Sequence, residues 1–455
     1  MTTNDESWNG PDTIGNLLLE QAARYPERDA VVVDDERLTY AQLAADALEM
    51  AYAFEANGVQ PMDHVALLMP NTLDFVRSMF GAFLAGLVVV PINARYRRQE
   101  LRHVIGHSDS VLLLTTDRAS NEIDLQGRIV DALGDYELDS ATGRLRVGAA
   151  PMLRQVYTFG RPAYDVIQPI DAFIDRHDAP HPSTAVGTPG GTSQGDDRAI
   201  VMYTSGTTAL PKGCELSHRG LIRGWHAYAT RIGMREGDRL WAPCPMFHMS
   251  GTGPLLASIS AGATMISQQH IDPDRSLQQV REEQPTHLHP AFPQITLGLV
   301  RHPEYRPTDL RAARALLNVG PADLQYEIQS LLPPQAALVN CFGMTEASGV
   351  ITMTDLTDPL DVRANSSGSA LDGLDLRIVK DSRECNAGEP GEIQFRGSNA
   401  LLRYYNDHEH TTLTIDEEGW VRTGDLGVVD GSGRLAFAGR MKDMLKVGGE
   451  NVAPL

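Results

Sequence analysis

Cysteine is scarce in this chain, with four residues among 455. No two of them have Cys-X-X-Cys spacing, which excludes a zinc ribbon and a thioredoxin-type redox pair. So few thiols in so long a chain also exclude a fold held together by disulfide bridges.

Positive charge is also in short supply. The chain has 39 Lys and Arg residues against 59 Asp and Glu residues, a formal net charge of −20. A uniformly acidic protein repels phosphate backbones and anionic membranes, so nucleic acid is not an expected partner. Any polyphosphate ligand must therefore be held by a local site together with a metal ion.

Long hydrophobic runs are missing as well. The densest apolar run, residues 79–92, contains Gly81, Gly86 and Pro91. It falls short of the roughly 20 apolar residues that a membrane helix needs. The first twelve residues are polar and acidic, unlike a secretory signal. We expect a cytoplasmic protein with no membrane span.

What is present is typical of a large globular protein, with 42% hydrophobic and 22% charged residues. Thr39 and Gln42 form a capping-box pair before an amphipathic run, which predicts the start of a helix. Apolar runs at 65–69, 87–90 and 111–114 alternate with helical patterns such as 73–85. This alternation predicts parallel strands that are covered on both faces.

The texture changes twice along the chain. Residues 177–195 are rich in Pro, Gly, Ser and Thr, which predicts a loop. Residues 199–366 return to an α/β pattern. Beyond them, short strand candidates at 374–379, 392–396 and 434–438 are separated by turns, which predicts a small antiparallel unit.

The sharpest motif is YTSGTTALPKG at residues 203–213. Its small hydroxyl and glycine residues can close around phosphate oxygens, and Lys212 supplies a point charge for the same group. It is not the GxxxxGK[ST] loop. Alone, the hydroxyl run could also be a polar surface loop.

Four further segments stand in a fixed order with this motif. They are PMFHMSG at 245–251, NCFGMTE at 340–346, GWVRTGD at 419–425, and GRMKD at 439–443 followed by KVGGEN at 446–451. With these motifs the chain resembles the adenylate-forming superfamily, which includes acyl-CoA synthetases, peptide-synthetase adenylation domains and beetle-type luciferases.

The resemblance implies an α/β fold of two sheet subdomains, about 1–198 and 199–366, plus a small antiparallel β-barrel-like subdomain at 367–440. Together these make a large N-terminal domain, residues 1–440. Residues 441–455 match the hinge, with Lys442 at its centre, and the start of a C-terminal domain of roughly 100 residues. The lysine of that domain which stabilises the adenylation transition state is not in this sequence.

The family reaction uses ATP, Mg²⁺ and coenzyme A. A small-molecule carboxylic acid attacks the α-phosphate to give an acyl adenylate, and the thiol of coenzyme A then displaces AMP. The resemblance leaves a homodimer open. The nucleotide-binding residues that it implies are Thr204, Ser205, Gly206, Thr207, Thr208, Lys212, Gly320, Ala322, Asn340, Cys341, Phe342, Gly343, Met344, Thr345, Asp425 and Arg440.

Catalytic roles are implied for Lys212, His248, Thr345 and Glu346. Glu346 is the implied magnesium ligand, because its carboxylate is a hard oxygen donor. Asp425 matches the acceptor of the ribose hydroxyls, although Thr-Gly-Asp alone would be an ordinary turn. Phe342 stands where the family usually has Tyr.

One segment departs from the family pattern. The adenine-contacting stretch reads Gly320-Pro321-Ala322-Asp323-Leu324 here. Pro321 lacks an amide donor and fixes its φ angle.

The implied acyl pocket contains Phe247, His248, Met249, Gly251 and Gly343. His248 occupies the position where amino-acid-activating members carry Asp. With Met246 and Gly253 nearby, the segment predicts an apolar, roomy wall for an uncharged acyl or aryl tail. Lys446, Gly448 and Gly449 match a segment that lines the coenzyme A tunnel.

Two other functions stay open at this point. One is amino-acid adenylation for a carrier domain, against which His248 argues. The other is nucleotide binding without efficient turnover by this chain.

Overall fold

The structure is a computed structural model. It describes residues 8–119, 123–139, 142–175, 193–204, 210–441, 445–447 and 450–452. Most of the loop expected at 177–195 lies outside these ranges. So do the side chains of the expected hinge and coenzyme A segment.

The first large sheet has eight strands. Six of its strands, β10, β4, β3, β5, β8 and β9, run parallel to one another. β11 runs antiparallel to both of its neighbours, β10 and β23. In spatial order they are β23 (Arg403–Tyr404), β11 (Lys212–Ser217), β10 (Arg198–Thr204), β4 (Val88–Pro91), β3 (His64–Leu68), β5 (Ser110–Thr116), β8 (Gln155–Phe159) and β9 (Ile167–Pro169).

The second large sheet has seven strands and is parallel except at its β1–β2 edge. In spatial order they are β16 (Ala337–Val339), β15 (Ala315–Asn318), β14 (His287–Ala291), β12 (Arg239–Trp241), β13 (Thr264–Ser267), β1 (Asp29–Val33) and β2 (Glu36–Thr39). The two sheets draw strands from both sides of residue 198, because β1 and β2 join this sheet while β10 and β11 join the other.

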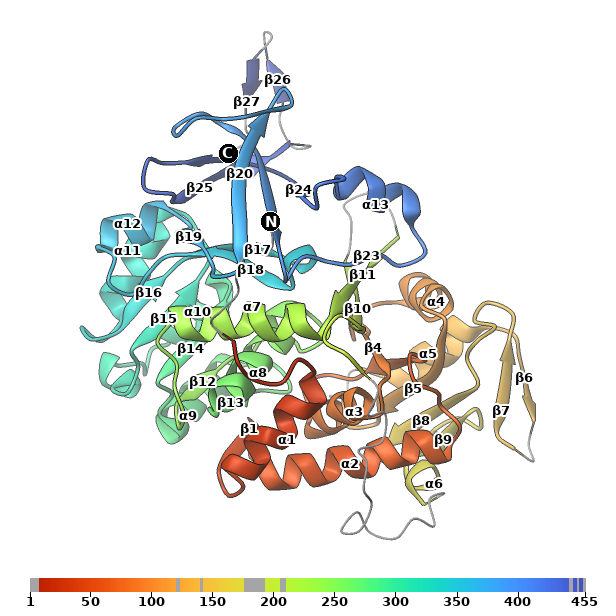
Figure 1. The fold of residues 1–455 in the computed structure, drawn as a ribbon. Coiled ribbons are helices and arrows are strands. Elements are labelled where there is room, and N and C mark those ends of the chain that lie inside the picture. Colours follow the sequence, from red (N-terminus) through yellow and green to blue (C-terminus); the bar gives the residue numbers. More distant parts are fainter. Residues whose placement is uncertain are drawn as a thin grey trace.

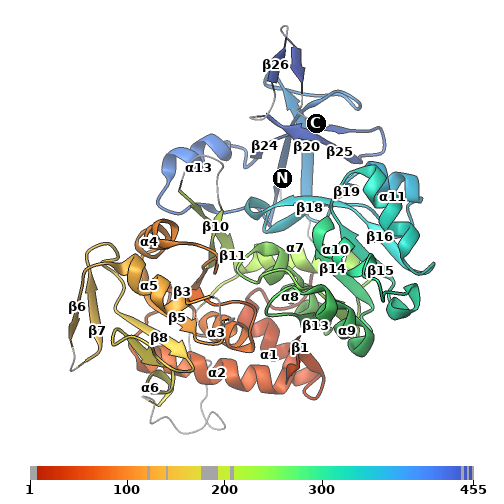
Figure 2. The same cartoon turned by 180° about the vertical axis from the view of Figure 1, so that it is seen from behind.

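The helices cover and separate the sheets (Figures 1 and 2). The longer ones are α1 (Ile14–Arg24), α2 (Tyr40–Ala56), α3 (Leu73–Leu84), α4 (Arg98–His107), α5 (Leu125–Leu133), α7 (His218–Arg231), α8 (Met249–Ala261), α9 (Pro273–Glu283), α10 (Pro293–Val300) and α11 (Ala322–Leu331). The shorter ones are α6 (Asp171–Ile174), α12 (Leu360–Asn365), α13 (His408–Thr414) and the 3-10 turns η1 (Pro307–Leu310) and η2 (Thr345–Ala347). Among the described residues, no helix is both long and apolar enough to cross a bilayer.

The smaller sheets lie mostly in the second half of the chain. The five-stranded antiparallel sheet contains β21 (Arg383–Glu384), β20 (Leu374–Lys380), β22 (Gly391–Gly397), β24 (Val421–Val429) and β25 (Leu435–Arg440). The others are β17 (Cys341–Met344) with β18 (Gly349–Met353) and β19 (Ser369–Ala370), and the hairpins β6 (Tyr136–Asp139) with β7 (Arg144–Val147) and β26 (Leu445–Val447) with β27 (Glu450–Val452). Figure 1 shows β20, β24 and β25 above the two large sheets.

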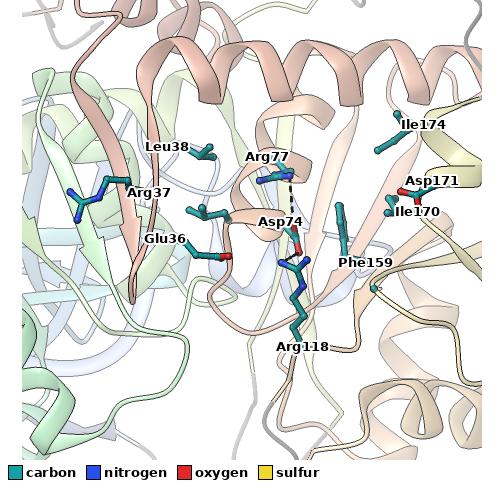
Figure 3. Close-up of a pocket in the computed structure, with 12 residues that line it drawn as sticks. Glu36, Arg37, Leu38, Asp74, Arg77, Arg118, Phe159, Ile170, Asp171 and Ile174 are labelled. Carbon is teal, nitrogen blue, oxygen red and sulfur yellow. Dashed lines mark ion pairs between the residues drawn. The ribbon is translucent and has the colours of Figure 1, made fainter.

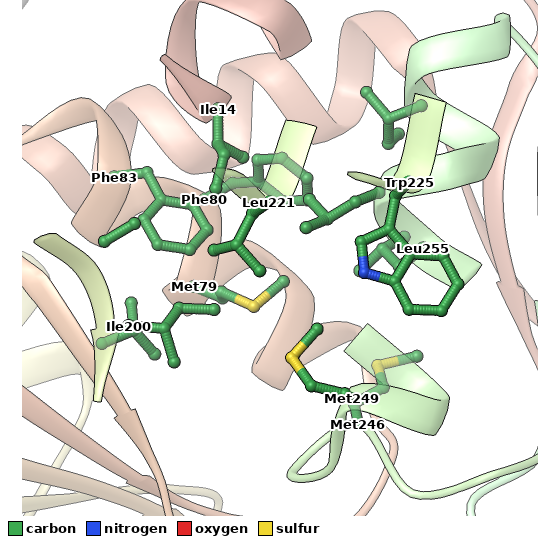
Figure 4. Close-up of a cluster of buried hydrophobic side chains, with 14 of the residues drawn as sticks. Ile14, Met79, Phe80, Phe83, Ile200, Leu221, Trp225, Met246, Met249 and Leu255 are labelled. Carbon is green, nitrogen blue, oxygen red and sulfur yellow. The ribbon is translucent and has the colours of Figure 1, made fainter. Parts of the chain in front are cut away.

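The main core lies between the two large sheets. One hydrophobic cluster contains Val31 of β1 and Val65 of β3 together with residues of α1, α3, α7 and α8. Figure 4 shows Ile14, Phe80, Leu221 and Trp225 converging in this layer. The helices between the sheets therefore bind one sheet to the other.

Several sequence predictions are confirmed. Thr39 caps α2 with a reciprocal bond to Gln42, as the capping box predicts. The runs at 65–69, 87–90 and 111–114 form β3, β4 and β5, and the helical pattern at 73–85 forms α3. The small antiparallel unit is also confirmed. The Thr-Gly-Asp segment, however, lies inside β24 and is not an isolated turn.

A buried carboxylate joins the C-terminal region to the eight-stranded sheet. Glu215 of β11 is 2% exposed and lies 3.2 Å from Arg198 Nη1 and 3.0 Å from Arg403 Nε. Arg403 belongs to β23, which pairs with β11 at the edge of the sheet. The three side chains thus hold β23 in register.

Breaking this group should destabilise the fold measurably. In Glu215→Gln, both arginines lose the charge that they share, and breaking a buried pair costs about 3 kcal/mol. We expect the free energy of unfolding in urea to fall by about 2–3 kcal/mol. The matched control is Glu389→Gln, which removes an exposed partner of Arg383 at 2.9 Å and should cost less than about 1 kcal/mol. Equal losses of unfolding free energy in the two variants would show that the Glu215 group does not stabilise β23.

Candidate active site

The expected phosphate loop connects two adjacent strands. β10 and β11 pair antiparallel up to Thr204 and Lys212, which face each other as the last pair. Ser205, Gly206, Thr207 and Thr208 lie outside the described residues. The two ends of the loop are therefore fixed by the sheet, on either side of the segment expected to hold phosphate.

Glu346 lies close to this hairpin. It belongs to η2, directly after β17, and is 9% exposed. The Tyr404 hydroxyl donates to Glu346 Oε1 at 2.7 Å. Tyr404 in turn pairs with Cys214 of β11, and Lys212 Nζ lies 5.5 Å from the centre of its ring. Tyr404, which the sequence analysis missed, thus links the expected metal ligand to the loop.

The electrostatics of this link keep the Tyr404 hydroxyl protonated. Burial first, and the Glu346 carboxylate second, raise the pKa of Tyr404 well above its usual value. Its hydroxyl therefore keeps the proton that it donates. A single buried carboxylate oriented by a neutral hydroxyl, with Lys212 nearby, fits a Mg²⁺ ion whose remaining ligands are phosphate oxygens and water. Among the described residues, no group of three His, Cys, Asp or Glu could hold a metal alone.

Asp425 and Arg440 face each other on neighbouring strands. They are a cross-strand pair of β24 and β25, and Arg440 Nε lies 3.5 Å from Asp425 Oδ1. Gly424 before Asp425 has φ +71°, a left-handed conformation that favours glycine. The cross-strand pairing places the Asp425 carboxylate beside the arginine, which suits a ribose with two hydroxyls.

Phe342 already has an aromatic partner. Its ring lies 5.8 Å from that of Phe437, centre to centre, with the planes inclined by 26°. Phe342 is buried, whereas Phe437 of β25 is half exposed. Phe437 was not predicted from the sequence, since it lies outside the motifs, and its exposed ring could stack on a flat base.

The other expected nucleotide residues lie on or next to β17 and at the start of α11. Met344 is half-buried at the end of β17. Asn340 donates through Nδ2 to the Ser366 carbonyl at 3.0 Å. The Cys341 side chain is buried in the main core, and burial raises the pKa of its thiol to about 12. Pro321 caps α11, so Gly320 and Ala322 stand at its start, at the carboxyl end of β15.

His248 stands at the start of α8. Its Nε2 lies 3.4 Å from Asn93 Nδ2, and its ring contacts that of Phe247 at 4.8 Å. Burial first, and Arg95 second, lower the pKa of His248. Its neutral form therefore persists below the ordinary range of about 6.5. The ring can line an uncharged pocket but supplies no negative charge.

The prediction of a roomy wall on α8 is wrong at two glycines. A Cβ added to Gly253 would lie 1.7 Å from the Trp225 ring, and one added to Gly251 would lie 2.3 Å from the Pro245 carbonyl oxygen. Both positions lack a side chain because a neighbour occupies the space. Met249 is buried close by (Figure 4).

Trp225 connects the two segments of the expected acyl pocket. Its indole also approaches the position that a Cβ on Gly349 would take, at 2.5 Å, and its Nε1 donates to the Ser348 carbonyl at 2.8 Å. Gly349 in turn leaves no room for a side chain on Gly343, where a Cβ would lie 2.1 Å from the Gly349 carbonyl oxygen. The indole therefore fills the space between α8 and β18.

Two histidines of α4 hold the stems of the phosphate hairpin. His103 Nε2 lies 2.9 Å from the Pro211 carbonyl oxygen, next to Lys212. His107 Nδ1 lies 2.8 Å from the Tyr203 hydroxyl, next to Thr204. The two rings stack at 5.0 Å. Their four-residue spacing on one helix was the available sequence signal, and the sequence analysis did not use it.

The last expected residues cannot be placed. Lys442, Gly448 and Gly449 lie outside the described residues. Lys446 is described only as part of the backbone of β26. Their expected roles at the hinge and the coenzyme A tunnel stay predictions.

Comparison with known proteins defines the class. The model of the family described as AMP-binding enzyme matches residues 18–405, most of the chain. The chain belongs to this family of AMP-forming acid–CoA ligases.

Individual relatives cover nearly the whole chain. YngI of Bacillus subtilis, whose name assigns it to the acyl-CoA synthetases, is 32% identical over 97% of this chain and 81% of its own length. The long-chain-fatty-acid–CoA ligase FadD13 of Mycobacterium tuberculosis is 30% identical over 97% of this chain and 81% of its own. The solved structure of the o-succinylbenzoate coenzyme A synthetase of Bacillus subtilis with AMP is 25% identical, has a TM-score of 0.77, and matches 96% of this chain and 81% of that one.

Removing the negative charge at Glu346 should cut adenylate formation strongly. Glu346→Gln keeps the shape of the side chain but makes a much weaker magnesium ligand, so binding of AMP alone should change little. Tyr404→Phe should cost about tenfold, because a hydrogen bond to a charged group is lost. Acyl-adenylate formation in a single turnover measures both. The control is Tyr305→Phe, which removes a hydroxyl bonded to the Leu331 carbonyl far from the hairpin. Unchanged adenylate formation in Glu346→Gln would show that Glu346 is not the magnesium ligand.

Loss of the His103 contact should weaken ATP binding. In His103→Ala the Pro211 carbonyl loses its donor, which costs about 1 kcal/mol and raises the KM for ATP about fivefold. His103→Gln keeps a donor and should restore most of the loss. A general loss of stability would instead lower kcat for every substrate, and steady-state kinetics against ATP and against the acid distinguish these outcomes.

Proposed function

We propose that this protein activates a compact, apolar carboxylic acid with MgATP and transfers the acyl group to coenzyme A. The observation that carries the proposal is the Glu346–Tyr404 contact beside Thr204 and Lys212. It supports a magnesium ion and a triphosphate at one place.

The first step forms the adenylate. A carboxylate oxygen of the acid attacks the α-phosphorus of ATP, the bond to the bridging oxygen of the β-phosphate breaks, and pyrophosphate leaves. Lys212 and the hairpin hold the β- and γ-phosphates, Thr345 contacts the α-phosphate, and Asp425 and Arg440 hold the ribose. Glu346 would hold a Mg²⁺ ion, which would neutralise charge on the phosphates. These residues act mainly by alignment and by fixed charge.

The second step forms the thioester. The thiol of coenzyme A attacks the acyl carbon, a carbon–sulfur bond forms, the bond to the phosphate oxygen breaks, and AMP leaves while the thiol proton passes to solvent. A neutral His248 suits the path of the thiol, because it adds no charge beside the carbonyl. Asn93 holds its ring through Nε2.

The character of the pocket disfavours an amino acid as substrate. The expected acyl pocket contains Phe247 and Met249, which are both buried, and a neutral His248, and Arg95 adds positive charge nearby. A buried ammonium would lack a carboxylate partner there, at a cost of several kcal/mol. Amino-acid adenylation is therefore the weaker candidate.

The indole of Trp225 limits the length of the acid. Gly253 lies five residues after His248 on α8, which corresponds to roughly 7 Å along the helix axis. Trp225 occupies the space beside Gly253 and is 2% exposed. This depth suits one ring or a short chain rather than a long-chain fatty acid.

A panel of acids tests the proposal. In ATP–pyrophosphate exchange, benzoate or hexanoate should be activated at least tenfold better than palmitate, and phenylalanine should fail. Trp225→Ala should move the preference towards longer acids, and Trp225→Phe, which leaves a smaller cavity, should give an intermediate length. Thermal melting identifies any variant that does not fold.

Three results would contradict it. Efficient exchange with a free α-amino acid would favour the carrier-directed alternative. Nucleotide binding with no exchange for any acid would favour a binding module. An unchanged length preference in folded Trp225 variants would remove the indole from the pocket.

A further inference from the structure

A second cavity lies at the carboxyl ends of strands in the eight-stranded sheet. From β3 the chain passes through α3 to β4 on one side, and from β4 through α4 to β5 on the other side of β3. α3 packs in the core between the sheets, whereas residues of α4 pack in a separate cluster on the other face. The point where the strand order reverses is therefore between β3 and β5. In open parallel sheets, ligands bind in the crevice outside the strand ends at this point.

The structure has a cavity of about 740 Å³ at this position (Figure 3). It is lined by Leu73, Asp74 and Arg77 after β3, by Arg118 after β5, and by Phe159 and Gly160 at the end of β8. None of the residues assigned above to nucleotide or acid lines it. Its size is in the range of small-molecule sites.

Two guanidinium groups in this cavity have spare donors. Arg77 lies 3.5 Å from Asp46 and 3.7 Å from Asp74, and Arg118 lies 3.8 Å from Asp74. These separations exceed hydrogen-bond length. Within the described ranges, neither guanidinium makes a hydrogen bond, and Arg77 Nε is buried without a partner. Arginine forks of this kind bind carboxylates well.

Apolar side chains form part of the cavity wall. Figure 3 shows Phe159, Ile170 and Ile174 beyond the Arg77–Asp74–Arg118 group, and Leu38 on its other side. Glu36, Asp171 and Arg37 also line the cavity, so that with Asp74, Arg77 and Arg118 its three carboxylates and three guanidinium groups balance in formal charge. This balance favours an anion with a single charge over a phosphate or polyphosphate.

We propose that this cavity is a second ligand site, separate from the catalytic one, for a monocarboxylate with an apolar tail. The carboxylate accepts hydrogen bonds from Arg77 and Arg118, and the tail packs on Phe159, Ile170 and Ile174. Binding is reversible and involves no covalent step.

Titration calorimetry with octanoate tests the site, on the whole chain with the catalytic pocket saturated by a non-hydrolysable acyl-sulfamoyl adenosine. Octanoate should still bind, and Arg118→Gln should weaken it at least tenfold. Arg118 is largely exposed, so the substitution should not disturb folding. The matched control is Arg37→Gln, because Arg37 lines the same cavity but already bonds Asp29 and Glu283 at 2.9 Å. It should change octanoate binding by less than twofold.

Two further probes check the ligand class. Acetate, which lacks the tail, should bind at least tenfold more weakly than octanoate, and inorganic phosphate should not compete. Octanoate binding that is abolished by the adenosine analogue, or that is the same in Arg118→Gln, would overturn the proposal. Phosphate binding that depends on Arg118 would overturn the ligand class. If the analogue itself does not bind, the proposed function fails, whereas the Arg118 and Arg37 comparison still decides this site.

Discussion

The carboxylate of Glu215 is the contact on which the arrangement of the site depends. It is buried between Arg198 of β10 and Arg403 of β23, and it fixes a strand of only two residues to the edge of a large sheet. The second of those residues is Tyr404, whose hydroxyl bonds Glu346. A buried ion group contributes little net stability but penalises every arrangement that separates its members. Its value here is register: it sets where β23 lies, and hence where the expected metal ligand lies relative to the phosphate hairpin.

Close to the expected nucleotide, neutral side chains hold the hairpin and Glu346 in place, and few side chains are charged. His103 and His107 hold the two stems of the hairpin, and Tyr404 holds Glu346. Burial keeps the Tyr404 hydroxyl protonated and His248 neutral. The charges expected to meet the nucleotide are those of Lys212, Glu346, Asp425 and Arg440. Because the whole chain has a net charge of −20, a polyphosphate can bind only where local contacts of this kind outweigh the general repulsion.

The sequence predicted most of what is local. The capping box at Thr39, the apolar strands and the helix at 73–85 depend on neighbouring residues, and each is confirmed. The exchange of strands across residue 198 was not predictable, because parallel pairing joins segments far apart in the chain. β24 was not predicted, because Gly424 is typical of a turn although it lies within the strand. The motif residues could be named from the sequence because the motifs follow one another in a fixed order. Tyr404, Phe437 and Asn93 lie outside the motifs, and only folding brings them close to the motif residues.

Gly253 shows why composition alone misjudges a pocket. A glycine on a helix next to a ligand segment predicts open space, but the same absence of a side chain is required wherever a large neighbour packs closely. Trp225 is that neighbour for Gly253 and Gly349 together, on two elements that are far apart in the sequence. Because Trp225 of α7 occupies the space beside both glycines, their lack of a side chain indicates close packing and not an open pocket. Under the proposed function, we therefore expect the length of the acid to depend on Trp225 as much as on α8 itself.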